Sequence, residues 1–464
     1  MTSIKQVGQS MQRILGEQAN QAARSTGFVQ RESKMGGAEF VQTLVFGWMS
    51  NPQATLEELA QTAASVGVSI TPQGLDQRFT KAGADCLQSV LDQAVQELVQ
   101  GEAPSNDFLK RFSGVYIQDS TIVDLPDELT EEWSGCGNPE GGGQPAAVKI
   151  EVRLNILQGE MIGPLLENGR VHDAVSQIQA VDLPKGALSI ADLGYWSLPE
   201  MERQAANGAF WLSRILTRAK VVTLDEKVWD LLTFLQTQPG HSIDCPIRLT
   251  AHHRVPARLL AIRVAQEVAD RRRHKLREEA QRRGKPVSQK RLALADWTIL
   301  VTNVPAEMLS LRQAMILIRV RWQIELLFKL WKSHGRIDEW RSTNPWRILI
   351  EVYAKLLAML IQHWLFLIGF WHFANRSLFK AACTVQRHAL LLASSCVALE
   401  ALVAAITVIQ RCLAAGCRIN KRKTDLRSPD TFENRRHDRS RASASGCSGT
   451  CSAQYPRTRA ARAG

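Results

Sequence analysis

The chain has 464 residues, of which 45% are hydrophobic, and a formal net charge of +12. It is too long for one ordinary domain, and its apolar content is enough for a sizeable core. The positive charge is concentrated in residues 271–291 and 418–464, each with a net charge of +8, which excludes a uniformly basic surface. Local charge of this kind predicts binding to a polyanion at particular sites.

The sequence also argues against secretion and membrane insertion. Residues 1–18 contain no apolar run of the kind found in secretory signals. The most apolar segment, Leu356–Trp371, is interrupted by Gln362 and His363, which favours a buried helix over a membrane span. The nine cysteines show neither disulfide nor zinc-finger spacing. We therefore expect free thiols in a cytoplasmic, nucleoid-associated protein.

Residues 1–110 are predicted to form a helical DNA-binding domain. Thr55 and Glu58 have the spacing of a capping box, and Thr71–Pro72 begins the next helix. Helix, short turn and helix is the outline of a helix-turn-helix motif, whose second helix would enter a DNA groove. Any two packed helices share this outline, so both interpretations stay open.

Strands are predicted from residue 111 onward. Two short strands each end in an acid, Val115–Asp119 and Leu188–Asp192, and Ala209–Ile215 is a third. Val148–Leu157 alternates polar and apolar residues, which predicts a strand buried on one face only. The glycine-rich segment 134–144 lacks the Gly-Lys-Ser/Thr ending of a phosphate-binding loop and is interpreted as a connection. The order of elements indicates a mixed α/β or α+β core.

Residues 220–296 interrupt this core. They contain strand-like runs followed by a basic helix at Arg271–Arg283. The strand Trp297–Thr302 comes next, residues 346–417 read as apolar helices, and the tail after Arg418 has no periodicity and is predicted to be disordered.

A single helix is predicted over Ile316–Lys332. Its apolar residues recur every three or four positions, and Arg321, Glu325 and Lys332 align on another face. This pattern is typical of a surface helix with ion pairs between successive turns. It also fits a metal-binding acid beside cations that grip phosphate.

Three acids, Asp119, Asp192 and Glu325, could act together. Side by side they would require a hard cation such as Mg²⁺, and two such ions could break and form phosphodiester bonds. Arg321 and Lys332 would then hold the DNA strand by its phosphates. Each aspartate taken alone is better explained as a helix cap or turn residue.

The segment 321–332 resembles the Tyr-Arg-Glu-Lys signature of the insertion-sequence-4 family of bacterial cut-and-paste DDE transposases. Arg321, Glu325 and Lys332 match by type and spacing, whereas Ile318 occupies the tyrosine position. Residues 117–121 and 191–195 look like the strands that carry the family's two aspartates. The resemblance spans roughly residues 27–427.

The resemblance implies an α/β fold with an RNase H-like core in two parts, residues 111–218 and 297–345. A mostly β insertion domain (219–296), a helical N-terminal domain (1–110), a helical C-terminal region (346–417) and a basic tail (418–464) complete the expected organisation. It further implies that Asp119, Asp192 and Glu325 are catalytic and bind Mg²⁺, for which Mn²⁺ can substitute. Double-stranded DNA, both element ends and target, and a homodimer are the implied partners.

Trp297 matches the position of a tryptophan that stacks on a flipped base in members of that family. Base stacking on an aromatic ring is worth about 1–3 kcal/mol. A core anchor for its own strand explains Trp297 equally well.

Two departures from the family pattern argue against activity of this copy, and two rival functions stay open. Ile318 cannot make the tyrosine's polar contact with phosphate, and we hypothesise that residues 435–464 are an out-of-frame translation. One rival is a catalytically inactive DNA-binding relic or an inhibitor of an intact transposase. The other is a structure-specific nuclease on the same core.

Overall fold

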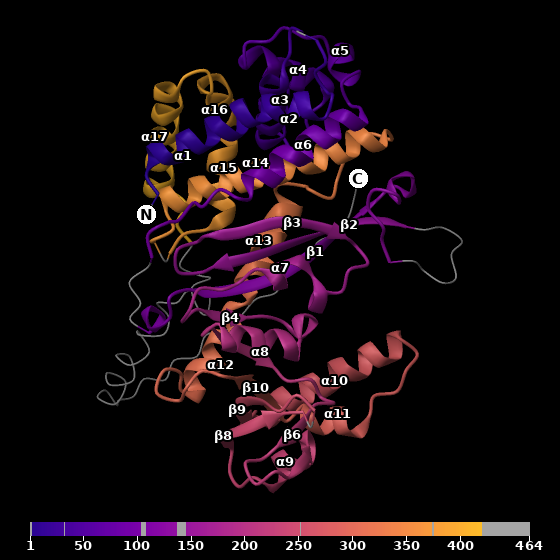
Figure 1. Ribbon diagram of the computed structural model, residues 1–464, viewed down its shortest axis with the longest axis vertical. Coiled ribbons are helices and arrows are strands. Elements are labelled where there is room, and N and C mark those ends of the chain that lie inside the picture. The colour runs from indigo at the N-terminus through magenta and orange to yellow at the C-terminus, as the bar shows by residue number, and fades with distance from the viewer. Residues whose placement is uncertain are drawn as a thin grey trace, which may run out of the picture. The chain divides into compact units, whose positions relative to one another are not determined.

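The computed structural model describes residues 2–31, 33–103, 108–136, 145–250, 252–373 and 375–419. Met1–Arg418 form one compact unit. Most of the glycine-rich segment 134–144 and nearly all of the predicted tail lie outside the described residues. The fold is mixed α/β, with a ten-stranded mixed sheet and helical N- and C-terminal regions (Figure 1).

The N-terminal region is helical, as predicted. Its helices are α1 (Ile4–Gln12), α2 (Ala19–Ser25), α3 (Gly37–Ser50), α4 (Leu56–Ser65), α5 (Pro72–Asp76) and α6 (Lys81–Ala94), with a π-helical segment (Arg13–Gln18) after α1. The capping box is confirmed: Glu58 N–H donates to Thr55 Oγ1 at 3.3 Å, and Thr55 N–H donates to Glu58 Oε2 at 2.7 Å. Helix α5 has only five residues, roughly 8 Å of length, so it is short for a groove-reading helix.

The sheet joins two sets of strands in the order β3-β2-β1-β4-β5-β10-β9-β8-β6-β7. β1 is antiparallel to β2 and parallel to β4, β4 is parallel to β5, and β10 is antiparallel to both β5 and β9. The strands are β1 (Val115–Leu125), β2 (Ala146–Asn155), β3 (Met161–Asn168), β4 (Leu188–Ile190), β5 (Phe210–Arg214), β6 (Lys220–Val222), β7 (Val228–Asp230), β8 (Ser242–Leu249), β9 (Val255–Arg263) and β10 (Trp297–Thr302).

The prediction that the first strand ends at Asp119 is wrong. β1 continues to Leu125, paired with β2 throughout. The added residues include the β-branched Thr121, Ile122 and Val123, which favour extended backbone. Asp192 does follow a strand, two residues after β4 ends, and is the N-cap of a 3₁₀ turn, Leu193–Tyr195.

The prediction that the second strand is half-buried is also wrong, because every residue of β2 is buried. Its polar face, with Lys149, Glu151 and Arg153, is at most 2% exposed. The chain between β3 and β4, which includes α7 (Gln177–Ala180), supplies partners for this face. Alternation along a strand shows that two faces differ in polarity, but it does not show that the polar one is open to water.

The insertion extends the core sheet through β10. Besides β6–β9 it contains α9 (Leu231–Thr237), α10 (Gln266–Arg282) and α11 (Gln289–Leu294), so it is mixed rather than mostly β. It packs around a second hydrophobic core, which residues of β5 and β10 share, and Figure 1 shows the insertion at the opposite end of the sheet from the N-terminal helices.

The helix predicted over 316–332 is two helices, α12 (Leu311–Val320) and α13 (Trp322–Ser333). They meet at Arg321, where Ile324 N–H donates to the Arg321 carbonyl at 3.2 Å, three residues back. A break of one residue leaves the apolar stripe in phase, so periodicity could not reveal it.

The remaining helices in the described residues are one between β4 and β5 in the chain and four that make up the C-terminal region. They are α8 (Leu198–Ala206), α14 (Pro345–Gly369), α15 (Leu378–Arg387), α16 (Ala389–Ser395) and α17 (Leu399–Ala415). α14 is long and apolar enough to cross a membrane, but 94% of its most apolar window is buried. The prediction of a buried helix is thereby confirmed, and α14 packs against α3, α6 and α17.

Candidate active site

Arg321 joins two of the predicted site acids. One guanidinium nitrogen lies 3.1 Å from Asp119 Oδ2 on β1, and another lies 2.5 Å from Glu325 Oε1 on α13. The side chain of Arg321 is 16% exposed, and those of Asp119 and Glu325 are 23% and 39% exposed. The break between α12 and α13 thus places a partly buried cation between two carboxylates that are distant in the sequence.

Asp192 lies within electrostatic reach of this group. Burial raises the pKa of Asp119 above its ordinary value, and the neighbouring Asp192 and Glu325 carboxylates act in the same direction. The Ser120 N–H, which donates to Asp119 Oδ1 at 2.9 Å, and the Arg321 guanidinium oppose this rise. The charges of Asp192 and Glu325 therefore both act on Asp119.

The three carboxylates are chemically suitable ligands for a hard divalent cation, because Mg²⁺ prefers oxygen ligands. In this conformation they do not form a closed ligand set. Within the described residues, no group of three or more His, Cys, Asp and Glu side chains could hold a metal ion. Arg321 donates to Asp119 Oδ2 and Glu325 Oε1, so its guanidinium would compete with a cation for these two oxygens.

Lys332 lies beside the same strand. Its Nζ donates to the carbonyl of Ile122 on β1 at 2.8 Å and lies 3.8 Å from Asp338 Oδ2. The side chain is 35% exposed. The structure therefore places Lys332 next to β1, three residues beyond Asp119.

Trp297 belongs to the hydrophobic core of the insertion instead. It is 6% exposed, and the guanidinium of Arg263 lies 4.8 Å from the centre of its ring. This packing is the core-anchor alternative, and a role in base stacking stays a prediction.

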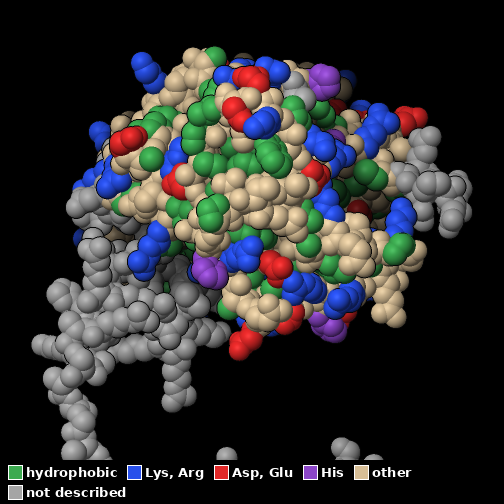
Figure 2. Space-filling model, turned by 90° about the horizontal axis from the view of Figure 1, so that it is seen from below, with side chains coloured by type: hydrophobic (Ala, Val, Ile, Leu, Met, Phe, Trp, Pro, Cys, Tyr) green, Lys and Arg blue, Asp and Glu red, His purple; other side chains and the backbone are tan. Residues whose placement is uncertain are grey.

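The basic helix α10 directs part of its charge inward. Arg272 donates to the Trp297 carbonyl at 2.9 Å, and Arg273 pairs with Asp270 and Asp296. Figure 2, which views the insertion end, shows Lys and Arg side chains interspersed with Asp and Glu side chains. This face therefore carries charges of both signs.

A buried ionic group behind Asp119 escaped the sequence analysis. Lys149 Nζ lies 3.0 Å from Glu151 Oε1 and 2.6 Å from Asp173 Oδ1, and Ser120 Oγ donates to Asp173 at 3.1 Å. The available signal was the alternation of opposite charges at Lys149 and Glu151 on one strand face. This alternation indicates an ion pair between the two side chains only when the polar face of β2 is known to be buried.

Comparisons with known proteins identify the family of this chain. A family model described as "Transposase DDE domain" matches residues 110–361. The transposase for insertion sequence element IS231C of Bacillus thuringiensis subsp. berliner is 28% identical over 363 residues, which cover 73% of this chain and 75% of the relative. The transposase for insertion sequence element IS1151 of Clostridium perfringens is 24% identical over 370 residues, 74% of this chain and 76% of the relative.

A further relative matches over a shorter region. The putative transposase InsL for insertion sequence element IS186A of Escherichia coli (strain K12) is 31% identical over 180 residues, 37% of this chain and 49% of the relative. The matched family region contains β1, the Asp192 turn and α13, which are the elements that carry the three acids. Because that match covers more than half of its length, the chain belongs to the transposase DDE domain family.

Proposed function

We propose that this protein is a Mg²⁺-dependent transposase that cuts and joins the ends of an insertion sequence in cut-and-paste transposition. Asp119, Asp192 and Glu325 would hold the metal, and Mn²⁺ can substitute for Mg²⁺. The observation that carries the proposal is the bridge from Arg321 to Asp119 and Glu325, with Asp192 within electrostatic reach. Relatives described as transposases for insertion sequence elements support it.

Two bound cations would supply an activated water or 3′-hydroxyl and a stabilised leaving oxygen. The chain's own residues would prepare the site for them. β1 holds Asp119 on a strand that is paired on both sides, and the Ser120 N–H orients its carboxylate. Once Arg321 leaves Asp119 and Glu325, its planar group can take a DNA phosphate in two parallel hydrogen bonds. Lys332, which lies beside β1, would contribute a second cation that holds the same DNA strand.

The fold supports the finer assignments. Three antiparallel strands, β3-β2-β1, continue into the parallel β4 and β5, and the acids lie on β1, just after β4, and on α13. We assign this part to an RNase H-like core of the insertion-sequence-4 type. Double-stranded DNA at the element ends and the target would be bound by a homodimer, because two ends must be held together.

Asp119→Asn tests the assignment. It keeps the size of the side chain but removes the charge that a metal requires, so nicking of the element's own ends in Mg²⁺ should be lost while DNA binding survives. Asp124→Asn, an exposed aspartate on the same strand, is the matched control and should cleave normally.

Each rival has its own outcome in this experiment. Cleavage by Asp119→Asn at the wild-type rate would reject the metal-ligand assignment. A wild-type protein that binds ends but cleaves them in neither Mg²⁺ nor Mn²⁺ would be the inactive DNA-binding relic. Efficient cutting of DNA without the element's terminal repeats would favour the structure-specific nuclease.

A further inference from the structure

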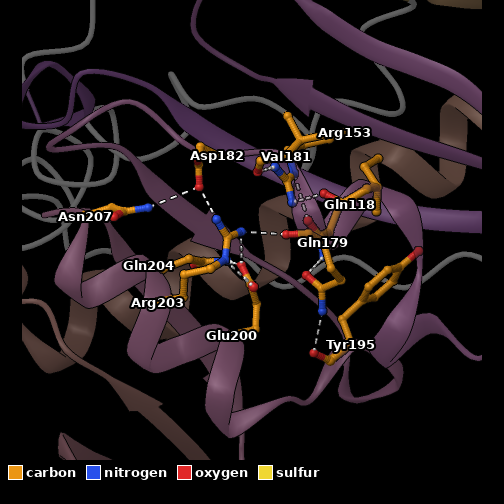
Figure 3. A network of polar contacts seen from close by, with 11 residues as sticks. Gln118, Arg153, Gln179, Val181, Asp182, Tyr195, Glu200, Arg203, Gln204 and Asn207 are labelled. Carbon is orange, nitrogen blue, oxygen red and sulfur yellow. Dashed lines mark hydrogen bonds and ion pairs between the residues drawn. The ribbon is translucent and has the colours of Figure 1, made fainter.

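A short chain of hydrogen bonds connects the strand of Asp119 to the turn of Asp192. Gln118 precedes Asp119 on β1, so its side chain points to the opposite face of the sheet. Gln118 Nε2 donates to Gln179 Oε1 at 3.1 Å, and Gln179 Nε2 donates to the carbonyl of Tyr195 at 3.0 Å (Figure 3). Tyr195 ends the 3₁₀ turn that Asp192 caps. The side chain of Gln179 therefore joins Gln118, the neighbour of Asp119, to the turn that follows Asp192.

Arg153 on β2 gives this chain a fixed direction. Its Nε donates to Gln118 Oε1 at 2.9 Å. Burial lowers the pKa of Arg153 to about 10, so at neutral pH it is still charged and can only donate. The oxygen of Gln118 must therefore face Arg153, which leaves its nitrogen for Gln179. The oxygen of Gln179 accepts that bond, and its nitrogen is left for the Tyr195 carbonyl.

The surroundings leave these side chains little freedom. Gln118 is 1% exposed, Arg153 0% and Gln179 6%. Arg153 also donates to the carbonyls of Ile178 and Val181, at 2.6 and 2.7 Å, on either side of Gln179. From α8, Arg203 donates to the Gln179 carbonyl at 2.7 Å, as Figure 3 shows. Gln179 is therefore held by β1 and the Asp192 turn through its side chain and by α8 through its backbone carbonyl.

We propose that Gln118 and Gln179 are positioning residues for the transposase chemistry. The directed chain from Arg153 through both glutamines to the Tyr195 carbonyl sets the place of the Asp192 turn relative to Asp119. It thereby sets how well the two carboxylates share a divalent cation. This inference rests on the proposed function, in which these acids hold the metal. Partners that orient metal ligands from behind typically change metal affinity by about 10- to 100-fold when they are lost.

Two substitutions remove the hydrogen bond from Gln179 to the Tyr195 carbonyl in different ways, because each places an oxygen of residue 179 against that carbonyl. Gln179→Glu keeps the acceptor for Gln118 but presents an oxygen to the Tyr195 carbonyl. Gln118→Glu keeps the acceptor for Arg153, which pairs with its charge. The second carboxylate oxygen of Gln118→Glu forces the Gln179 amide to turn over, so that Gln179 again presents oxygen to Tyr195. Because Gln118→Glu strengthens the contact with Arg153, it provides a folded variant even if Gln179→Glu is unstable.

Mn²⁺ binding to the full-length chain without DNA, measured by titration calorimetry, is the main readout. Both variants should bind Mn²⁺ about 10- to 100-fold more weakly than wild type. The Mg²⁺ concentration needed for half-maximal cleavage should rise in parallel. Gln362→Glu is the matched control: Gln362 on α14 is 1% exposed and donates to Met359 Sδ at 3.7 Å, outside the contacts that hold Gln179. It should lower the melting temperature and leave Mn²⁺ affinity unchanged.

The failure of this inference differs from the failure of the proposed function. If Asp119→Asn binds Mn²⁺ as tightly as wild type, the acids are not the metal site and the proposed function fails. If Mn²⁺ binding depends on Asp119 but Gln118→Glu and Gln179→Glu keep wild-type affinity, the positioning role is overturned. An equal loss of affinity in Gln362→Glu would also overturn it, because the effect would then follow from general destabilisation.

Discussion

The guanidinium of Arg321 donates a hydrogen bond to the carboxylate of Asp119 at 3.1 Å, across 202 positions of sequence. The same group bonds Glu325, four residues further on. In the protein without metal, Arg321 therefore neutralises two acids that would otherwise repel each other. A residue assigned by resemblance to DNA contact thus has a second task within the free protein.

Arg321→Gln should reduce the free energy of unfolding by about 1–3 kcal/mol in EDTA, because it leaves two partly buried carboxylates without their cation. Added Mn²⁺ should reduce this deficit, since a ligand that binds only the folded state stabilises it. Urea denaturation with and without Mn²⁺ measures both effects. Arg319→Gln, at an exposed position on α12, is the control. Equal stability of Arg321→Gln and wild type in EDTA would contradict the account.

Lys149→Met should be among the most damaging substitutions in β2. Lys149 is 2% exposed and Glu151 0%, so removing the ammonium leaves a buried carboxylate uncompensated. The expected loss is about 3–5 kcal/mol of unfolding free energy, measured by urea denaturation. The double variant Lys149→Met with Glu151→Gln removes both charges and should recover part of it. A double variant less stable than the single one would show that the pair is not the cause.

His363 should make the fold sensitive to acid. It is fully buried on α14, its Nε2 lies 2.7 Å from the Gly159 carbonyl, and burial lowers its pKa to about 4. Below a pH of about 6.5, the pKa of histidine in the unfolded chain, the unfolded chain binds a proton at His363 that the folded chain does not bind. Stability should therefore fall as pH drops from about 6.5 to about 4, by on the order of 3 kcal/mol from this group. His363→Gln, compared with wild type by denaturation at pH 7.5 and 4.5, should lose less stability over that interval. Parallel losses would reject the assignment.

Trp297 offers a test between core packing and base stacking. Because it is 6% exposed within the insertion core, Trp297→Ala should cost about 3–5 kcal/mol of unfolding free energy in the absence of DNA. Trp297→Phe keeps much of the buried area and should retain most of the stability and cleavage. If Trp297→Ala is as stable as wild type yet fails to process DNA ends, base stacking is the better explanation.

Much of the secondary structure followed from the sequence, because it depends on neighbours along the chain. The cap at Thr55, the strand Trp297–Thr302 and the buried helix around His363 are each determined by propensity, capping and apolar content within a few turns. The spacing of Arg321, Glu325 and Lys332, together with two aspartate strands, was sufficient to suggest the DDE transposase family.

Only the tertiary structure decided which polar groups are covered and which partners they meet. The sequence of β2 predicts a strand with one solvent-exposed face, yet the segment between β3 and β4 covers Lys149 and Arg153. Likewise, no local pattern shows that Arg321 lies between Asp119 and Glu325, or that Gln179 connects β1 to the Asp192 turn. Such contacts join segments far apart in sequence, and their energies depend on burial, which is a property of the folded whole.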